Sequence, residues 1–246
     1  MVITGLLPPQ VAACESLEDH PEFVPHQAEA ASLRSSAGGR RREFANGRYC
    51  AHRALELLGA PAASIPAGER GAPSWPRSVV GSITHCRGYT AAAVARRGEI
   101  VALGIDAEPH LPLDAEVLEF VAGLEERALV AELLVRRPEV RWDRLLFSAK
   151  ESVYKAWFPA TGLFLGFLQA CVRFDPSAGT FRADVPDAVR AGARLPGGTR
   201  LPVRFTGRWR VSGDVLVTAV AVPATEAETT PAAGLAVPAS PEGERE

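Results

Sequence analysis

The sequence predicts an α+β protein built from two similar halves. Long segments with apolar residues at helical spacing are followed by short runs rich in β-branched and small apolar residues. Turns containing Gly or Pro separate these runs, so neighbouring strands should pair mainly antiparallel. A helix followed by roughly three strands occurs twice, which hints at an internal duplication of long period. Hydrophobic residues form 47% of the 246-residue chain, enough for a buried core.

The first half is expected to begin with loops and short strands up to about residue 38, with room for one helix. A helix with a strongly basic entry should follow in the segment "GGRRREFANGRYCAHRALELLGAP", which ends in Gly and Pro. After a loop rich in Pro and Gly, three strand-like runs predict an antiparallel meander: "SVVGSITH", "YTAAAVAR" and "IVALGIDAE".

The second half repeats this order. One helix is expected over residues 115–135 and another over 141–158. Two hairpins should follow, with turns at residues 176–179 and 212–214. We therefore divide the chain into an N-terminal α+β subdomain (1–105) and a C-terminal one (106–222). The remaining tail (223–246), rich in Pro, Ala, Glu and Thr, should be disordered.

The overall composition disfavours several classes of protein. The formal net charge of −2 argues against general nucleic-acid binding. No apolar run is long enough for a membrane span, and the N-terminus lacks a signal-peptide pattern. The four cysteines show neither zinc-site spacing nor a dense disulfide framework. A reduced, cytoplasmic protein is expected.

Two carboxylates close the strand "IVALGIDAE". Asp106 and Glu108 are two residues apart, so they point to the same face. Like charges held this close need a cation or hydrogen-bond donors between them, and Mg²⁺ prefers such hard oxygen ligands together with phosphate oxygens. The pattern favours a metal-phosphate site. Its ordinary alternative is a solvated strand end followed by Pro109.

The helix "LLFSAKESVYKAW" carries three charges among apolar residues: Lys150, Glu151 and Lys155. The ordinary interpretation is a surface ion pair between Glu151 and Lys155, four residues apart and worth only about 0.2–0.5 kcal/mol. However, their neighbours are Phe, Tyr and Trp. We therefore expect an acid that completes a metal shell and lysines that bind phosphate.

Basic residues upstream offer further phosphate contacts. The entry helix carries five arginines, whose guanidinium forks suit bidentate phosphate binding, unless they form a solvated face. His85 follows the strand "SVVGSIT" beside a tight turn, where a lone His is more often structural than functional.

Taken together, these motifs resemble the 4'-phosphopantetheinyl transferases of the Sfp/EntD type. The family patterns G-(I/V)-D-x-E and (F/W)-(S/C/T)-x-K-E-(A/S)-x-x-K correspond to "GIDAE" and "FSAKESVYK", in order and about forty residues apart. The resemblance extends from about Phe44 to Trp157. It implies a pseudo-twofold pair of α+β subdomains, each a helix on a small antiparallel sheet, with coenzyme A in the cleft between them.

The resemblance also implies roles for individual residues. Glu151 and Lys155 would be catalytic, with Glu151 acting as a base directly or through a metal-bound water. The ligands of Mg²⁺, with Mn²⁺ as an alternative, would be Asp106, Glu108 and Glu151. The coenzyme A contacts would be Arg41, Arg48, Arg53, Arg70, Thr84, His85, Asp106, Lys150 and Lys155. Some members have Lys in a "GKP" turn where this chain has Ala72, and Arg70 is then the substitute charge.

The implied reaction moves the phosphopantetheine arm of coenzyme A onto a serine of an acyl or peptidyl carrier protein and releases adenosine 3',5'-bisphosphate. The length resembles members that serve polyketide and nonribosomal peptide pathways. If the two halves pair internally, one chain holds a complete site, so we expect a monomer. We expect the carrier to dock on residues 115–135 or on the following arginines, Arg136, Arg137 and Arg141. Two alternatives remain: a non-catalytic coenzyme A or nucleotide-binding module, and a Mg²⁺-dependent phosphohydrolase.

Overall fold

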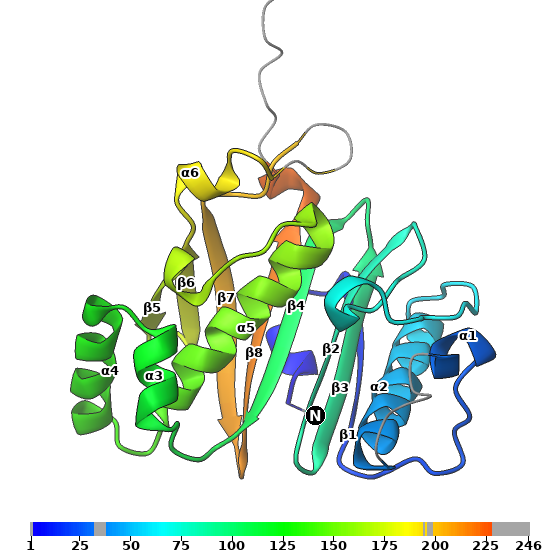
Figure 1. The fold of residues 1–246 in the computed structure, drawn as a ribbon, viewed down its shortest axis with the longest axis horizontal. Helices are drawn as coiled ribbons and strands as arrows, with labels where there is room; N and C mark the ends of the chain where they lie inside the picture. The colour runs from blue at the N-terminus through cyan, green and yellow to red at the C-terminus, as the bar shows by residue number, and fades with distance from the viewer. Residues whose placement is uncertain (1, 32–37, 194, 196–198, 228–246) are drawn as a thin grey trace, which may run out of the picture.

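Two antiparallel sheets lie side by side in the computed structural model, which describes residues 2–31, 38–193, 195 and 199–227 (Figure 1). The first sheet has the strand order β1-β3-β2, and the second has the order β4-β8-β7-β6-β5. The strands are β1 (Val11–Ser16), β2 (Val79–Cys86), β3 (Tyr89–Arg96), β4 (Ile100–Pro109), β5 (Cys171–Asp175), β6 (Thr180–Asp184), β7 (Arg204–Ser212) and β8 (Val215–Pro223).

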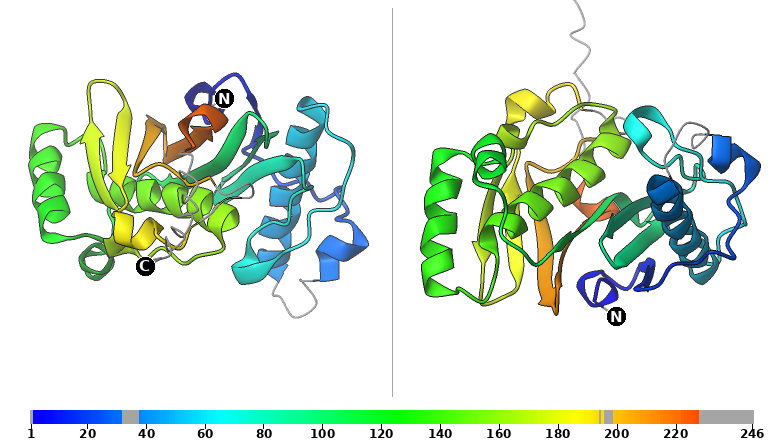
Figure 2. Two further views of the ribbon diagram at one scale, coloured as in Figure 1. Left: turned by 90° about the horizontal axis from the view of Figure 1, so that it is seen from above. Right: turned by 60° about the horizontal axis from the view of Figure 1, so that its bottom comes forward.

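One long helix covers each sheet (Figure 2). Helix α2 (Gly38–Leu57) packs on β1 and β3, and α5 (Trp142–Thr161) packs on β4 and β8. The shorter helices are α1 (Gln27–Ala30), α3 (Ala115–Val121), α4 (Leu124–Arg136) and α6 (Asp187–Arg190), with 3-10 turns η1 (Thr4–Leu6), η3 (Glu69–Gly71), η4 (Phe167–Gln169) and η5 (Ala224–Glu226). Within the described ranges, no helix combines the length and apolar character that a membrane crossing requires.

The two halves share one topology, and in each half a strand precedes the helix that was expected to come first. In the first half, β1, α2, β2 and β3 follow in sequence, and the third strand lies between the other two. In the second half, β4, α5, β7 and β8 repeat this arrangement, while β5 and β6 extend the sheet. The repeated unit is therefore strand–helix–strand–strand.

The expected three-strand meander is wrong in its last strand. β2 and β3 form the hairpin, but β3 has β1 on its other side, so no edge of β3 is free for β4. β4 pairs instead with β8, from Ile100 opposite Pro223 to Pro109 opposite Val215. The division that we placed between residues 105 and 106 thus falls inside one strand.

Side-chain hydroxyls join the two sheets. β2 and β4 run next to each other, and the Ile105 amide donates to Ser82 Oγ at 3.1 Å while the Ala107 amide donates to Thr84 Oγ1 at 2.9 Å. These hydroxyls satisfy the amides on the free edge of β4, which would otherwise be buried without a partner. Hydroxyls thus replace a backbone ladder between the halves.

The "GIDAE" glycine sets how closely α5 approaches β4. A Cβ on Gly104 would overlap the Ser152 carbonyl oxygen and lie 2.7 Å from the Ala156 nitrogen. Only glycine permits this contact between backbones. α5 matches the predicted helix and runs one turn further, to a left-handed Gly162 cap at φ 70°. Its buried face packs into the second sheet around Trp142, Trp157 and Phe205.

The expected helix over residues 115–135 is broken into α3 and α4. The break at Ala122 and Gly123 starts a new helix, where the Glu126 carboxylate caps the Gly123 amide at 2.9 Å. The Val121 carbonyl that the break exposes accepts from Lys150 Nζ at 2.8 Å. A buried cation therefore compensates for the lost helical turn.

Both predicted hairpins are present, with turns between β5 and β6 and between β7 and β8. The tail was expected to start at Pro223, but Pro223 still pairs with Ile100 and the Ala224 amide donates to the Glu99 carbonyl at 2.8 Å. Backbone hydrogen bonds thus order the chain to η5. Residues 228–246 of the predicted tail lie outside the described residues.

Candidate functional site

The centre of the site lies where the end of β4 faces α5. Asp106 is buried, and its Oδ1 lies 2.6 Å from Lys155 Nζ on α5. Thr84 Oγ1 on β2 donates to the same oxygen at 3.4 Å and also lies 3.5 Å from Lys155 Nζ. Burial alone would lower the pKa of Lys155, but the carboxylates of Asp106, Glu151 and Glu108 raise it. Lys155 is therefore a firmly charged ammonium among three acids.

The second Asp106 oxygen, Oδ2, is buried without a hydrogen-bond partner. Burial and then the charge of Asp106 raise the pKa of Glu108 to about 6, although Arg144 Nη1 lies 3.1 Å from Glu108 Oε2 and opposes the shift. Burial also raises the pKa of Glu151; Lys155 opposes this shift, and Asp106 adds to it. The acids thus share more negative charge than the nearby cations neutralise.

These observations fit a divalent cation. An orphaned buried carboxylate oxygen and two neighbouring carboxyls of raised pKa are what a hard cation would satisfy. No three His, Cys, Asp or Glu side chains in the described part of the chain are already arranged as a metal-ligand group. The residues suit the ion chemically, while the geometry of ligation is not preformed.

Arg144 is a site residue that the sequence motifs missed. It joins Glu108 and also donates to the carbonyls of Leu111 and Pro112, so it holds the chain that leaves β4. Helical spacing could have identified Arg144 as a site residue. Arg144 lies seven residues before Glu151, about two helical turns, and therefore occupies the same face of α5.

Three adjoining hollows form one cleft between the halves. The first, of about 400 Å³, and the second, of about 260 Å³, share Gly71, Pro73 and Ile83 as lining residues. The third, of about 130 Å³, shares Glu151 and Tyr154 with the second. The shared walls make a continuous path from α2, past α5, to η4.

The first hollow is basic. Arg40, Arg48 and His85 line it, together with Phe44 and Glu43. The Arg48 side chain is held rigidly, because Nε donates to the Ile65 carbonyl at 2.7 Å and the guanidinium lies 4.2 Å from the Phe44 ring centre. Burial lowers its pKa to about 10, which leaves it charged at neutral pH. The structure thus brings Arg48 and His85 together, as predicted, and adds Arg40.

The second hollow combines charges from both halves. Arg70, in the η3 loop, faces Glu151, Tyr154 and Lys155 on α5. Its guanidinium lies 5.3 Å from the Phe164 ring centre, and its backbone is left-handed at φ 53°, a conformation rare for a side chain of this size. Arg70 therefore reaches the cleft from the loop in which Ala72 stands.

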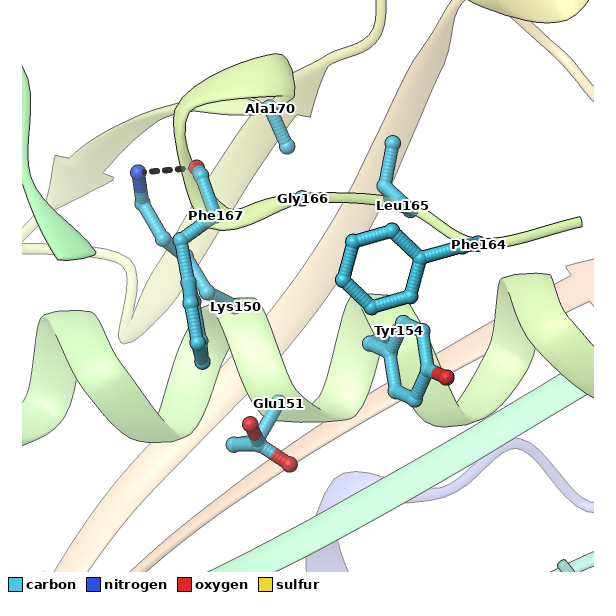
Figure 3. A pocket seen from close by; sticks show the side chains of 8 residues that line it. All are labelled: Lys150, Glu151, Tyr154, Phe164, Leu165, Gly166, Phe167 and Ala170. Atoms are coloured by element: carbon cyan, nitrogen blue, oxygen red, sulfur yellow. Dashed lines mark hydrogen bonds between the residues drawn. The ribbon is translucent and has the colours of Figure 1, made fainter. Parts of the chain in front are cut away.

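The third hollow is mostly apolar. Tyr154 on α5 lies next to Phe164 in the chain leading into η4, and Phe167, at the start of η4, lies beside the stem of Lys150 (Figure 3). Glu151 lies at the edge of the hollow. The stem of Lys150 lines this hollow while its ammonium is bonded to the Phe167 carbonyl. Apolar walls beside an acid would suit an uncharged, flexible ligand segment.

Comparisons with known proteins agree on one family. The family model described as the 4'-phosphopantetheinyl transferase N-terminal domain matches residues 28–95, and that of the 4'-phosphopantetheinyl transferase superfamily matches residues 102–194. The chain is 47% identical over 228 residues to 4'-phosphopantetheinyl transferase Svp of Streptomyces mobaraensis, covering 91% of this chain and 90% of Svp. It is 42% identical over 227 residues to 4'-phosphopantetheinyl transferase Npt of Nocardia iowensis, covering 89% and 99%.

The chain belongs to the 4'-phosphopantetheinyl transferase superfamily. The resemblance read from "GIDAE" and "FSAKESVYK" is thereby confirmed. The model of the superfamily begins two residues after β4 starts, and its match contains the acids of the site.

In this transferase, Lys150 lines the third hollow but neither the first nor the second. Its ammonium is buried and uses all three donors inside the protein, on Val121 O, Glu126 Oε2 and Phe167 O at 2.7–2.8 Å. This geometry leaves the ammonium no free donor for coenzyme A, so the contact of Lys150 with coenzyme A stays a prediction without structural support. The sequence does not indicate that Glu126 pairs with Lys150, because the periodicity around Glu126 predicts only one continuous amphipathic helix.

Other predicted contacts of the transferase lie elsewhere or serve a different purpose. Arg53 is exposed beyond the first hollow and pairs with Glu56. Arg41 is exposed on the first turn of α2 and does not line the hollow. Thr84 is buried, and its hydroxyl is engaged with Asp106, Lys155 and the Ala107 amide. The Thr84 hydroxyl thus contacts Asp106 and Lys155 and helps to position them.

Proposed function

We propose that the chain transfers the 4'-phosphopantetheine arm of coenzyme A to a serine of an acyl or peptidyl carrier protein and releases adenosine 3',5'-bisphosphate. The observation that carries this proposal is the order of chemistry along the cleft. Arg40, Arg48 and His85 make the first hollow basic. Charges of both signs, Arg70, Lys155 and Glu151, line the second, and mostly apolar groups line the third. Coenzyme A has the same order of nucleotide phosphate, pyrophosphate and pantetheine.

The basic hollow would take the 3'-phosphate and adenine. Arg48 and Arg40 supply positive charge, and His85 stands at the rim. A guanidinium that is already fixed by Ile65 and Phe44 loses little rotamer freedom on binding, so it would favour affinity. Arg70 and Lys155 would face the pyrophosphate from opposite walls of the second hollow.

Asp106, Glu108 and Glu151 are the residues that would hold Mg²⁺, with Mn²⁺ as an alternative. When bound, the ion would supply positive charge to the pyrophosphate oxygens. Thr84 and Lys155 would keep Asp106 Oδ1 in place while its free Oδ2 faces the ion. Arg144 would orient Glu108 in the same way.

The proton of the attacking serine needs an acceptor in the cleft. Glu151 lies between the second and third hollows, where the pyrophosphate and the pantetheine arm would meet. We therefore assign it the proton, taken directly or through a bound water. Lys155 would stabilise the negative charge that builds up on the departing bisphosphate.

We further propose that the carrier docks beside the third hollow. An exposed apolar patch lies there on α3, the start of α4 and the chain around η4: Val117, Phe120, Leu124, Leu163, Phe164 and Leu168. Phe120 makes an edge contact with Phe167, a lining residue of the hollow, so patch and cleft are continuous. Carriers of polyketide and nonribosomal peptide pathways are the proposed partners.

Glu151→Gln tests the assignment, because it keeps the size of the side chain and removes the base. With coenzyme A, Mg²⁺ and an apo carrier, intact-mass measurement should show transfer reduced by about 10²–10⁴-fold. Glu132 is an exposed acid of α4 that pairs with Arg136, so Glu132→Gln is the matched control and should transfer normally. Near-normal turnover of Glu151→Gln would reject its role.

The same assay separates the alternative functions. A binding module would retain coenzyme A in equilibrium dialysis and leave the carrier mass unchanged. A phosphohydrolase would release free phosphate without adding mass to the carrier. Added phosphopantetheine on the carrier, with release of adenosine bisphosphate, is expected only for the transferase.

A further inference from the structure

Two cysteines meet between β1 and α2, outside the cleft. Cys14 and Ala12 lie on the face of β1 that packs against α2, and Cys50 is fully buried on the facing side of that helix. Cys50 Sγ lies 3.8 Å from the carbonyl of Thr90, which pairs with Ser16, two residues along β1 from Cys14. Cys14 packs against the buried cluster that contains Cys50, and the two thiols are close enough to shift each other's pKa. All four cysteines are free in this structure.

The surroundings make these two thiols unequal. The Cys50 thiol and the charge of Arg53 lower the pKa of Cys14 to about 7, against burial and Glu15, which raise it. The Cys14 thiol and burial raise the pKa of Cys50, so it stays protonated. Cys14 is also the more accessible of the pair. A partly exposed thiolate beside a protonated thiol is the arrangement found in oxidation-sensitive pairs.

The other two cysteines lack these features. Burial and the carboxylates of Glu108 and Asp106 raise the pKa of Cys86 to about 12. Burial and Glu126 raise that of Cys171. Both therefore remain neutral thiols at neutral pH and should react slowly with oxidants.

We propose that Cys14 and Cys50 form a reversible oxidation site, in which a hydroperoxide converts Cys14 to a sulfenic acid and Cys50 then closes a disulfide between β1 and α2. In the first step, the Cys14 thiolate attacks one peroxide oxygen. The O–O bond breaks, sulfur loses two electrons, and the departing oxygen takes a proton to leave as water or alcohol. In the second step, Cys50 sulfur bonds to Cys14 sulfur, and the hydroxyl leaves as water with the Cys50 proton.

The pair of cysteines gives a role to Arg53, whose charge lies outside the cleft. Arg53 follows Cys50 by three residues on α2, lies beyond the first hollow, and acts on Cys14 electrostatically. Its positive charge favours the thiolate that starts the first step. The proposal is independent of the transferase reaction, since none of these side chains lines the three hollows.

Peptide mapping of the native wild-type protein tests the site. After treatment with hydrogen peroxide in the absence of reductant, free thiols should fall from four to two, with a mass loss of about 2 Da. Trypsin separates all four cysteines, so the product should be residues 1–34 linked to residues 49–53. A dithiol reductant should restore four thiols. Four persisting thiols, a different linked pair, or Cys14 over-oxidised with Cys50 free would overturn the proposal.

Variants separate the two steps. Cys50→Ser should block the disulfide and leave Cys14 as a sulfenic acid that dimedone traps, whereas Cys171→Ser, the matched control, should form the disulfide as the wild type does. Failure of dimedone to label folded Cys50→Ser would count against Cys14 as the attacking thiol. If Cys50→Ser does not fold, the wild-type map decides the matter alone.

Discussion

Lys150 and Lys155 lie on one helix but serve different partners. Lys150 turns toward α3, α4 and η4, where Glu126 Oε2 lies 2.7 Å from its ammonium. Glu126 also accepts from the Gly123 and Val172 amides, so the pair ties three segments together. Burial lowers the pKa of Lys150, and Glu126 opposes that shift. The motif lysine that was expected at the ligand is thus a structural one.

Lys150→Met should therefore affect folding and leave ligand binding unchanged. Removing one partner leaves Glu126 buried with an unpaired charge, which costs about 3–5 kcal/mol of unfolding free energy. Urea unfolding measures this loss. Arg136→Met, which breaks the exposed pair with Glu132, is the matched control and should cost below about 1 kcal/mol. A stable Lys150→Met protein with a raised KM for coenzyme A would return Lys150 to the ligand.

Glu108 gives the metal-free protein a pH dependence. Its pKa is about 6 in the folded chain against an ordinary value of 4.5, so the folded state binds this proton more tightly. The resulting stabilisation is complete below pH 4.5 and is lost as pH rises through about 6. The difference amounts to about 2 kcal/mol.

Urea unfolding in EDTA at several pH values tests this effect. Between pH 4.5 and 6.5, stability should fall by about 1.5 kcal/mol more in wild type than in Glu108→Gln, which cannot ionise. Parallel pH profiles for the two proteins would show that Glu108 titrates normally. Glu139→Gln, an exposed acid, is the control and should follow the wild type.

Among the elements, the close pair of α5 and β4 sets the geometry of the site. Glu151 immediately precedes Ser152, whose carbonyl occupies the space of a Gly104 side chain, and Asp106 follows Gly104 by two residues. Each displacement of the helix would therefore move Glu151 and Lys155 away from Asp106. Gly104 of "GIDAE" thus helps to position the acids, although it does not contact them, because it lets α5 approach β4 closely.

Gly104→Ala should weaken both folding and transfer. The added methyl must push α5 outward, because its nearest neighbours are backbone atoms, and such overpacking costs about 1–3 kcal/mol or more. Thermal unfolding and the carrier mass assay measure the two effects. Gly98→Ala, where nothing lies within 4 Å, is the matched control and should change neither. Unaltered stability of Gly104→Ala would mean that the helix and strand are less tightly packed.

Local sequence patterns predicted most helices and strands. The elements that were predicted wrongly depend on partners far away in the sequence. The helical periodicity of α2 and α5 and the turn residues of both hairpins are local signals, and these predictions are confirmed. The break after Val121 depends on Lys150, 29 residues away, so periodicity alone could not show it. Likewise, β4 looks like the third strand of a meander until β1 is known to occupy the far edge of β3.

The same limit applies to the site. Asp106, Glu151 and Lys155 come together as the motifs predicted, because each motif lies on one regular element. Arg53 and Lys150 do not line the first or second hollow, because a basic residue in a motif does not indicate which side of its helix faces the cleft. Arg144 was missed because it lies outside the motif, three residues before Phe147.

At the scale of the whole molecule, both walls of the cleft come from one chain. β2 and the η3 loop supply the first wall, and α5 supplies the second. We therefore predict an active monomer. Light scattering after size-exclusion chromatography should give about one chain mass, 26.2 kDa, and specific activity should not vary with protein concentration. Activity that declines on dilution together with a dimer mass would contradict this prediction.

The seam between β2 and β4 has a further consequence. The chain crosses it at the short turn between Arg96 and Ile100, and otherwise the two sheets meet through hydroxyls and packed side chains. A cut in that turn would leave Arg48, Arg70 and His85 on one fragment and all three acids with Lys155 on the other. Neither fragment would hold a complete site. Recovery of transfer upon mixing them would then report the association of the two sheets, making this seam a natural position for fragment complementation.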